Sequence, residues 1–171
     1  MGEPNQSPTY LQDFGDEILV VCPQCRECAL LVRFERESVN WGNRLVCHHC
    51  GHSRDWRVRR RDRVVFPGSG PHLVYGLETW LQVRCWGEVL WAFNREHLEF
   101  LRSFVSSDLR KRPRVPNHGW ANRSLESRLP RWIKAAKNRE IVLRKLDELE
   151  RQLPEAYRRP VAESDGKRGS A

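Results

Sequence analysis

The fold of this chain is decided by Cys22-Pro-Gln-Cys25-Arg-Glu-Cys28, a stretch that is matched further along by Cys47-His-His-Cys50-Gly51. Each stretch contains a C-x-x-C turn, called a knuckle below, and twenty-one residues separate the two knuckles. A two-residue gap lets a tight turn direct both sulfurs at one ion, and backbone amides inside the turn donate to the thiolates. The spacing therefore predicts a metal site made of Cys22, Cys25, Cys47 and Cys50.

Zinc is the ion that we expect at this site. Zn²⁺ takes four thiolates in a tetrahedron at roughly 2.3 Å and has no redox chemistry of its own. In a reducing compartment, the six cysteines of this chain are more typical of metal binding than of disulfides. The sequence therefore predicts one structural zinc ion.

Other side chains near the knuckles leave alternative ligand sets open. His48, His49 or His52 could each be a ligand, which would give a Cys3His site with Cys28 or one knuckle cysteine left out. A histidine inside the two-residue gap normally points away from the metal. Cys28 falls where the chain leaves the turn, so we expect it to be a small buried hydrophobic residue. A redox role for Cys28 would require an exposed, electropositive site, which the neighbouring Arg26 makes conceivable.

Strand-like segments lead into and out of both knuckles, at residues 18–21, 29–36, 44–46 and 55–65. With the four cysteines, this pattern resembles the zinc-ribbon superfamily of general transcription factors and RNA polymerase subunits. The resemblance covers about a quarter of the chain, and the later CWGEVLWAFNREHL is similar to a segment of small bacterial zinc-ribbon proteins. The resemblance implies an antiparallel zinc ribbon and a cellular compartment, but no activity.

An α+β arrangement is predicted beyond the ribbon. Residues 77–85 alternate as a half-buried strand, and residues 89–93 alternate afresh, which predicts a hairpin that turns near residues 86–88. Asn94 is placed to cap a helix that runs to about Lys111. A further helical stripe runs from Pro130 to Leu153 and is interrupted at Arg139. This stripe is typical of a helix packed on its own domain, because it is short for a coiled coil.

The composition along the chain predicts four parts. We expect a disordered lead-in at 1–17, the zinc ribbon at 18–66, a β-hairpin plus helical domain at 73–153, and a disordered tail at 154–171. The stretch VVFPGSGPH supplies the linker between the two folded parts. The predicted fold class is therefore α+β, with an N-terminal antiparallel ribbon followed by a hairpin and two or more α-helices.

An arginine-rich segment, DWRVRRRDRVV, follows the second knuckle, in a chain whose formal net charge is +8. A strand there would place Trp56, Val58 and Val64 on one face. The other face would carry four arginines, with about 6.6 Å between neighbours: Arg57, Arg59, Arg61 and Arg63. Four guanidinium groups in a row suit a nucleic-acid backbone, of either DNA or RNA. One alternative is a charged edge strand that prevents aggregation. The other is a GC-rich genome, which makes arginine abundant without any ligand.

Three residues of the predicted hairpin extend this candidate surface. Trp80, Arg84 and Trp86 share the face of their strand that also carries Gln82. Such a polar and aromatic face is suited to stacking on bases or to contacting another protein. We assign two of the seven tryptophans, Trp91 and Trp132, to the core.

Catalysis is not expected, because a zinc ion with four protein ligands has no position for an activated water. Asp62, Glu78 and Glu88 form no recognisable nuclease cluster, and His97 is interpreted as an exposed residue at a helix start. The sequence has no apolar run of membrane-spanning length and begins without a leader pattern, so we expect a cytoplasmic protein with no membrane contact.

Two functions follow. The first is a non-enzymatic zinc-ribbon protein that binds nucleic acid. The alternative is a protein-interaction adaptor of a larger complex, with the ribbon and the tryptophan-bearing hairpin as docking surfaces.

Overall fold

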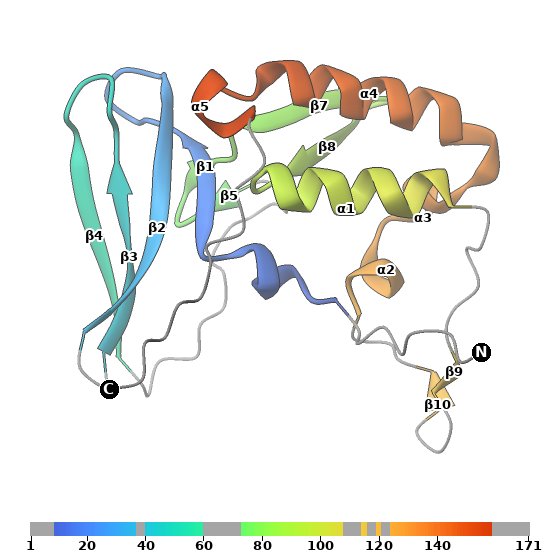
Figure 1. Ribbon diagram of the computed structural model, residues 1–171, viewed down its shortest axis with the longest axis horizontal. Helices are drawn as coiled ribbons and strands as arrows, with labels where there is room; N and C mark the ends of the chain where they lie inside the picture. Colours follow the sequence, from blue (N-terminus) through green and yellow to red (C-terminus); the bar gives the residue numbers. More distant parts are fainter. Residues whose placement is uncertain are drawn as a thin grey trace, which may run out of the picture.

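The computed structural model describes residues 9–36, 40–59, 73–107, 114–115, 119–120 and 124–158 (Figure 1). The strands are β1 (Glu17–Val21), β2 (Cys28–Arg36), β3 (Asn40–Val46), β4 (Ser53–Arg59), β5 (Leu73–Val74), β6 (Leu77–Glu78), β7 (Leu81–Cys85), β8 (Glu88–Ala92), β9 (Arg114–Val115) and β10 (Gly119–Trp120). The helices are η1 (Leu11–Phe14), α1 (Arg95–Ser106), α2 (Leu125–Arg128), α3 (Arg131–Lys134), η2 (Ala136–Asn138), α4 (Arg139–Gln152) and α5 (Glu155–Arg158), with η1 and η2 of the 3₁₀ type. None of these helices is long and apolar enough to cross a membrane.

The predicted α+β class is confirmed. Strands β1 to β4 form one antiparallel sheet in chain order, called the ribbon below, and the helices with the β7–β8 hairpin form a second body beside it (Figure 1). Side-chain alternation gives the ribbon an apolar face, because opposed positions such as Ile18 with Leu31 and Leu31 with Leu45 are all buried. The strands predicted around both knuckles are therefore present, except that residues 60–65 of the last one lie outside the described residues.

Strand β1 belongs to both bodies. Ile18 and Val20 pack in the ribbon core, whereas Leu19 points the other way into the core of the helical body. The Leu19 N–H donates to the Phe93 carbonyl (2.8 Å), and the Trp80 N–H donates to the Leu19 carbonyl (2.9 Å). The outer edge of β1 is therefore covered by the helical body.

The single strand predicted over residues 77–85 is wrong. The chain forms β6, which pairs with β5, and then β7, which pairs with β8. Thr79 between them bridges to Val20 of the ribbon. The alternation of side chains continues through the break, with Thr79 and Leu81 fully buried. The sequence pattern therefore identified the buried face, while the change of pairing partner divided the strand.

Helices α1 and α4 lie side by side and antiparallel over the β7–β8 hairpin (Figure 1). Asn94 caps α1 as predicted, because its side chain accepts the His97 N–H at 2.9 Å. Leu98, Leu101 and Val105 of α1 are buried in one core with the apolar stripe of α4. The helix ends at Ser106 rather than at Lys111, because Ser107 is extended.

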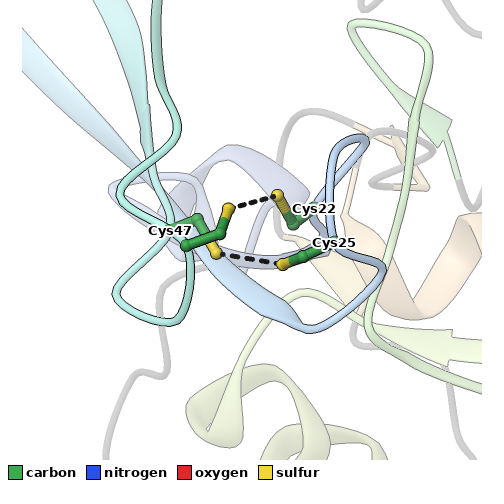
Figure 2. Close-up of side chains that lie close together, drawn as sticks. Cys22, Cys25 and Cys47 are labelled. Carbon is green, nitrogen blue, oxygen red and sulfur yellow. Dashed lines mark hydrogen bonds between the residues drawn. The ribbon is translucent and has the colours of Figure 1, made fainter.

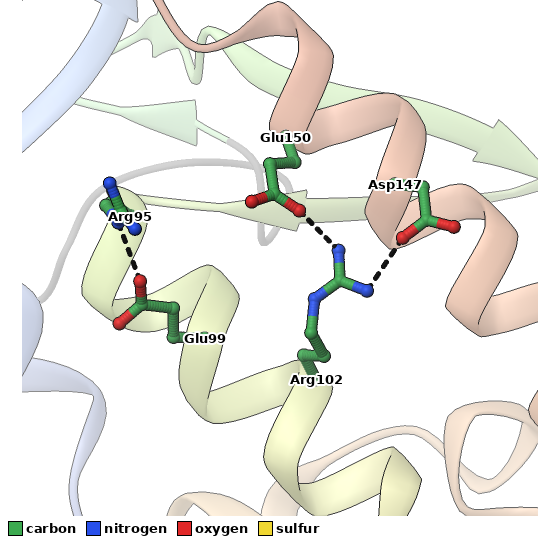
Figure 3. Close-up of polar contacts among 5 residues, drawn as sticks. All are labelled: Arg95, Glu99, Arg102, Asp147 and Glu150. Carbon is green, nitrogen blue, oxygen red and sulfur yellow. Dashed lines mark hydrogen bonds and ion pairs between the residues drawn. The ribbon is translucent and has the colours of Figure 1, made fainter. Parts of the chain in front are cut away.

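An arginine between the two helices fixes their register. Figure 3 shows Arg102 of α1 directed at α4, where its two terminal nitrogens each lie 2.7 Å from a carboxylate, one of Asp147 and one of Glu150. Arg95 pairs with Glu99 within α1 at 2.6 Å. These groups are half-exposed, so water screens them and the apolar contacts provide most of the stability.

The continuous helix predicted from Pro130 to Leu153 is also wrong. Helix α3 ends at Lys134, Ala135 is extended, and α4 begins only at Arg139. The Arg139 guanidinium donates to the carbonyls of Val105 (3.1 Å) and Ser107 (2.8 Å), at the C-terminus of α1. Arg139 therefore interrupts the apolar stripe because it caps the neighbouring helix.

We expected disorder at both ends of the chain, but this prediction is wrong for the residues there that the structure describes. Phe14 of η1 packs against both cores, and Tyr157 of α5 packs against the helical core. Asn94 Nδ2 also donates to the Phe14 carbonyl at 3.0 Å. The described parts of the lead-in and tail are therefore held by apolar contacts, and the division into four parts stays a prediction.

His97 is buried rather than exposed, which corrects the sequence-based interpretation. Its ring is 2% exposed, stacks on Phe14 with centroids 4.9 Å apart, and contacts the rings of Trp91 and Phe93. The Phe93 N–H donates to His97 Nδ1 at 3.2 Å. Burial among these rings lowers the pKa of His97 from 6.5 to about 4, so the side chain is neutral at pH 7.

We predict that this histidine makes the stability of the protein fall in mild acid. Its pKa is lower in the folded chain, so its contribution is complete above about pH 6.5 and is lost as the pH falls toward 4. Between about pH 7.5 and about pH 5.5 the loss amounts to roughly 1 to 1.5 kcal/mol. Denaturant titrations of the parent and of His97→Gln, which keeps an acceptor for Phe93, will measure it. Equal pH dependence in both proteins would contradict the assignment.

Candidate metal centre

The two knuckles repeat the same backbone hydrogen bonds. In the first, the Arg26 N–H donates to the Cys22 carbonyl at 3.0 Å, and the Cys22 N–H donates to the Glu27 carbonyl at 2.8 Å. In the second, Gly51 donates to Cys47 at 2.9 Å, and Cys47 donates to His52 at 2.9 Å. The knuckles join β1 to β2 and β3 to β4, at the same end of the ribbon. The sheet therefore brings two equivalent turns face to face.

Four cysteine sulfurs converge between these turns. The ligand atoms of Cys22, Cys25, Cys47 and Cys50 all lie within 4.8 Å of one another. Figure 2 shows the sulfurs of Cys22, Cys25 and Cys47 turned toward a common centre. The sulfurs of Cys22 and Cys50 are 3.8 Å apart, and those of Cys25 and Cys47 are 3.5 Å apart. A tetrahedron with metal–sulfur bonds of roughly 2.3 Å has edges of about 3.8 Å. The four predicted cysteines are thus positioned to hold one metal ion.

Backbone amides favour the charged form of one of these thiols. The Cys50 N–H, assisted by the Cys25 thiol and the His49 N–H, lowers the pKa of Cys47 to about 6 against the opposing effect of burial. Cys22 and Cys47 are buried, whereas Cys50 is exposed. The site is therefore enclosed on the side of the ribbon core and reaches solvent at the second knuckle.

The alternative ligands do not join the cluster. Among the residues that the structure describes, His48, His49, His52 and Cys28 are not part of any metal-binding group. Cys28 packs instead against the helical core, where burial raises the pKa of its thiol to about 12. Such a thiol is a poor nucleophile and a poor redox centre. Cys28 therefore packs as a small hydrophobic residue, as predicted, although it is half-buried rather than fully buried.

The two knuckles differ at the residue that follows their second cysteine, a difference not predicted above. Gly51 has a φ of 75°, and Arg26, at the equivalent position of the first knuckle, has a φ of 66°. This left-handed conformation suits glycine and strains an L-amino acid by about 1–2 kcal/mol. Arg26 forms an ion pair with Glu78 at 3.2 Å, which links the first knuckle to β6. The signal was visible in the sequence, because Gly51 follows the second pair while Arg26 follows the first.

The arginine-rich strand is present as the edge strand β4. Arg57 is exposed, and Trp56 lies on the opposite face, stacked on Tyr75 with centroids 5.4 Å apart. Asp55 shares the face of Arg57 and is held by two nitrogens of Arg44, at 2.7 and 2.9 Å. Arg59 ends the strand, while Arg61 and Arg63, with the predicted linker, lie outside the described residues.

The hairpin part of the predicted nucleic-acid surface is only partly open. The Trp80 indole N–H donates to the Gln152 carbonyl at 2.9 Å, and its ring packs against the helical core. Trp80 is therefore half-buried and stabilises the fold, and its contact with nucleic acid stays a prediction. Arg84 and Trp86 are exposed, whereas Trp91 and Trp132 pack against the two cores as predicted.

The predicted surface residues also lie far apart. Strand β4, which carries Arg57, and helix α3, which carries Trp132 in contact with Trp86, are at opposite ends of the view in Figure 1. The ribbon arginines and the tip of the hairpin are therefore two separate surfaces.

Comparison with known proteins adds no relative: no family model, no curated protein and no solved structure matches this chain. The described architecture is nevertheless that of a zinc-ribbon-like site, with four cysteines on a four-stranded antiparallel sheet.

We predict different outcomes for two neighbouring cysteines. Cys25→Ser removes one of four ligands, so metal content should fall below one ion per chain and the ribbon should unfold. Cys28→Ser should keep the full metal content and lower the free energy of unfolding by only about 1 kcal/mol, because Cys28 is a packing residue. Metal analysis of the purified variants by mass spectrometry, with circular dichroism, provides the test. Loss of metal in Cys28→Ser would show that the ligand set is wrong.

We also predict that substitutions at the two equivalent knuckle positions change the free energy of unfolding in opposite directions. Arg26→Gly relieves the left-handed strain and should raise the free energy of unfolding by about 0.5 kcal/mol, after the loss of its exposed ion pair. Gly51→Ala introduces the same strain, although the added methyl group meets nothing within 4 Å. This substitution should therefore lower the free energy of unfolding by about 1 kcal/mol. Denaturant titrations at saturating metal will measure both changes, and a shared sign would refute this account.

Proposed function

We propose that the metal is one structural zinc ion and that the protein is a non-enzymatic zinc-ribbon protein that binds nucleic acid. Four thiolates at tetrahedral spacing suit Zn²⁺, which has no redox role and requires no further ligand. The zinc would stabilise the ribbon and hold its strands in position. The binding surface would be the arginine face of β4.

The open edge of the ribbon carries this proposal. Of the two edge strands, β1 is covered by Trp80 and Phe93, whereas no strand among the described residues pairs with the outer side of β4. Arg57 is exposed there, and the carboxylate nearest to it on the same strand face, that of Asp55, is engaged by Arg44. The sequence continues through Arg59, Arg61 and Arg63, which would extend the contact along a phosphate backbone.

A binding role fits the described part of the chain better than catalysis. The metal ligands fill all four positions of a tetrahedral site, which leaves none for a reacting water. A cavity between β1, α1 and α5, lined by residues that include Glu17, Arg95 and Tyr157, has a volume of about 80 Å³, which is below the roughly 300 Å³ or more of common ligand pockets. A second hollow, lined by residues that include Asp16 and Arg33, has about 520 Å³ but is widely open to solvent, so it would bury little of a substrate.

We predict that binding weakens with salt and depends on the arginines of β4. Each phosphate contact contributes about −0.7 to −0.9 to the slope of log K against log salt concentration. Replacement of Arg57, Arg59 and Arg61 together by glutamine should therefore flatten this slope by about 2 units and abolish binding at moderate salt. Fluorescence anisotropy with a labelled oligonucleotide over a series of salt concentrations measures the slope.

A variant with the same change of charge provides the control. Lys137, Arg144 and Arg151 are exposed on η2 and α4 rather than on β4, so their joint replacement by glutamine should leave the slope near that of the parent. If the control loses as much as the β4 variant, net charge rather than the strand determines binding. If the parent protein binds no nucleic acid and instead purifies with a protein subunit, the adaptor function takes its place.

A further inference from the structure

One aromatic side chain at the tip of the β7–β8 hairpin is unusually exposed. Trp86 is 55% exposed, and no other large apolar side chain is exposed among the residues whose side chains the structure describes. It lies directly after β7, whose last residue, Cys85, is buried. The indole therefore projects from a well-packed hairpin.

The backbone at Trp86 is strained as well. Trp86 has a φ of 51° and Gly87 a φ of 83°, which is the pattern of a type I′ turn. The first position of such a turn normally holds asparagine, aspartate or glycine, because a bulky residue there is strained. A tryptophan at this position thus has a conformational cost of about 1–2 kcal/mol.

A second turn of the same type shows how the fold can offset this strain. Tyr75 and Gly76, between β5 and β6, have φ values of 53° and 78°. Tyr75 stacks on Trp56, and its hydroxyl donates to Asn43 Oδ1 at 2.9 Å. Trp86 has neither stacking nor burial of this kind, since its ring contact among the described residues is an edge contact with Trp132, at 6.4 Å and 88°. Its strain is therefore not offset within the described chain.

The contact with Trp132 orients the exposed ring. Trp132 is half-buried against the helical core, so it forms a firm support. A perpendicular contact covers at most one face of the Trp86 indole and leaves the other face to solvent. The arrangement holds a flat aromatic surface outward.

The charges near this surface are mostly positive. Arg84, two residues before Trp86 on β7, is exposed, as are Arg128 and Arg131, which lie close to Trp132 in the sequence. Glu88 is the exposed acid next to the turn, and Lys145 and Glu148, close to Cys85, neutralise each other at 2.9 Å. An aromatic face among exposed arginines complements an anionic, aromatic ligand.

We propose that Trp86, supported by Trp132, stacks on an unpaired base of single-stranded nucleic acid, with Arg84 and Arg131 contacting the adjacent phosphates. This inference rests on the proposed nucleic-acid binding and specifies its form. A paired base in a duplex already has neighbours on both faces, so only an unpaired base can use the indole. Because the hairpin tip and β4 are separate surfaces, the strand would meet two contact points on one protein.

The experiment compares single-stranded and duplex oligonucleotides of about 20 nucleotides with the full chain, by fluorescence anisotropy. Trp86→Asn supplies the residue that a type I′ turn prefers, so the variant should melt at the same temperature as the parent or higher. It should raise the dissociation constant for the single strand by about 5- to 100-fold, the value of one stacked base, and leave that for the duplex unchanged. Trp86→Tyr, which keeps an aromatic face, should stay within roughly threefold of the parent.

Tyr75→Asn is the matched control, because Tyr75 occupies the same position of the other type I′ turn but is used for packing. It should lower the melting temperature and leave the affinity for the single strand unchanged. Unchanged affinity in Trp86→Asn, an equal loss for single strand and duplex, or a Trp86-dependent protein partner without an effect on oligonucleotides would overturn the stacking site. If the parent binds neither oligonucleotide, the proposed nucleic-acid function itself fails, which the variants alone would not show.

Discussion

Four sulfur atoms within 4.8 Å of one another form an arrangement that a positive charge at its centre would stabilise. Thiolates so close together repel, and neutral thiols at that spacing gain little from one another. A bound cation would turn the repulsion into four bonds, so metal binding and folding of the ribbon would become one equilibrium. Because each knuckle joins two strands, the same bonds would hold both hairpins of the ribbon in register.

The influence of the metal site extends beyond the ribbon through β1. This strand leads directly into Cys22, and its residues alternate between the two cores, with Ile18 and Val20 on one side and Leu19 on the other. Its outer edge is bonded to Trp80 and Phe93 of the helical body. The position of the first knuckle is therefore linked to that of the β7–β8 hairpin and of α1. A strand shared in this way couples the stability of the two bodies.

Three described residues other than glycine have a positive φ, and they mark where the fold departs from local preference. Arg26 links the first knuckle to β6 through Glu78, and Tyr75 attaches the β5–β6 hairpin to the ribbon through Trp56 and Asn43. At both positions a contact between distant segments accompanies the strained turn. Trp86 is different, because its ring is mostly free in solvent. This contrast within one chain separates strain that serves packing from strain that packing does not explain.

The sequence by itself determined the local features. The spacing of Cys22, Cys25, Cys47 and Cys50 specified a metal site, the alternation in β7 and β8 specified a hairpin, and Asn94 specified the start of α1. Spacing and alternation depend on bond geometry over a few residues, so they can be read without knowing the fold. Tertiary structure alone decided that the strand over 77–85 divides at Thr79, that Arg139 caps α1, that His97 is buried, and that the Trp80 indole is bonded to the Gln152 carbonyl. These outcomes depend on which distant segment each residue meets, and periodicity along the chain carries no information about that partner.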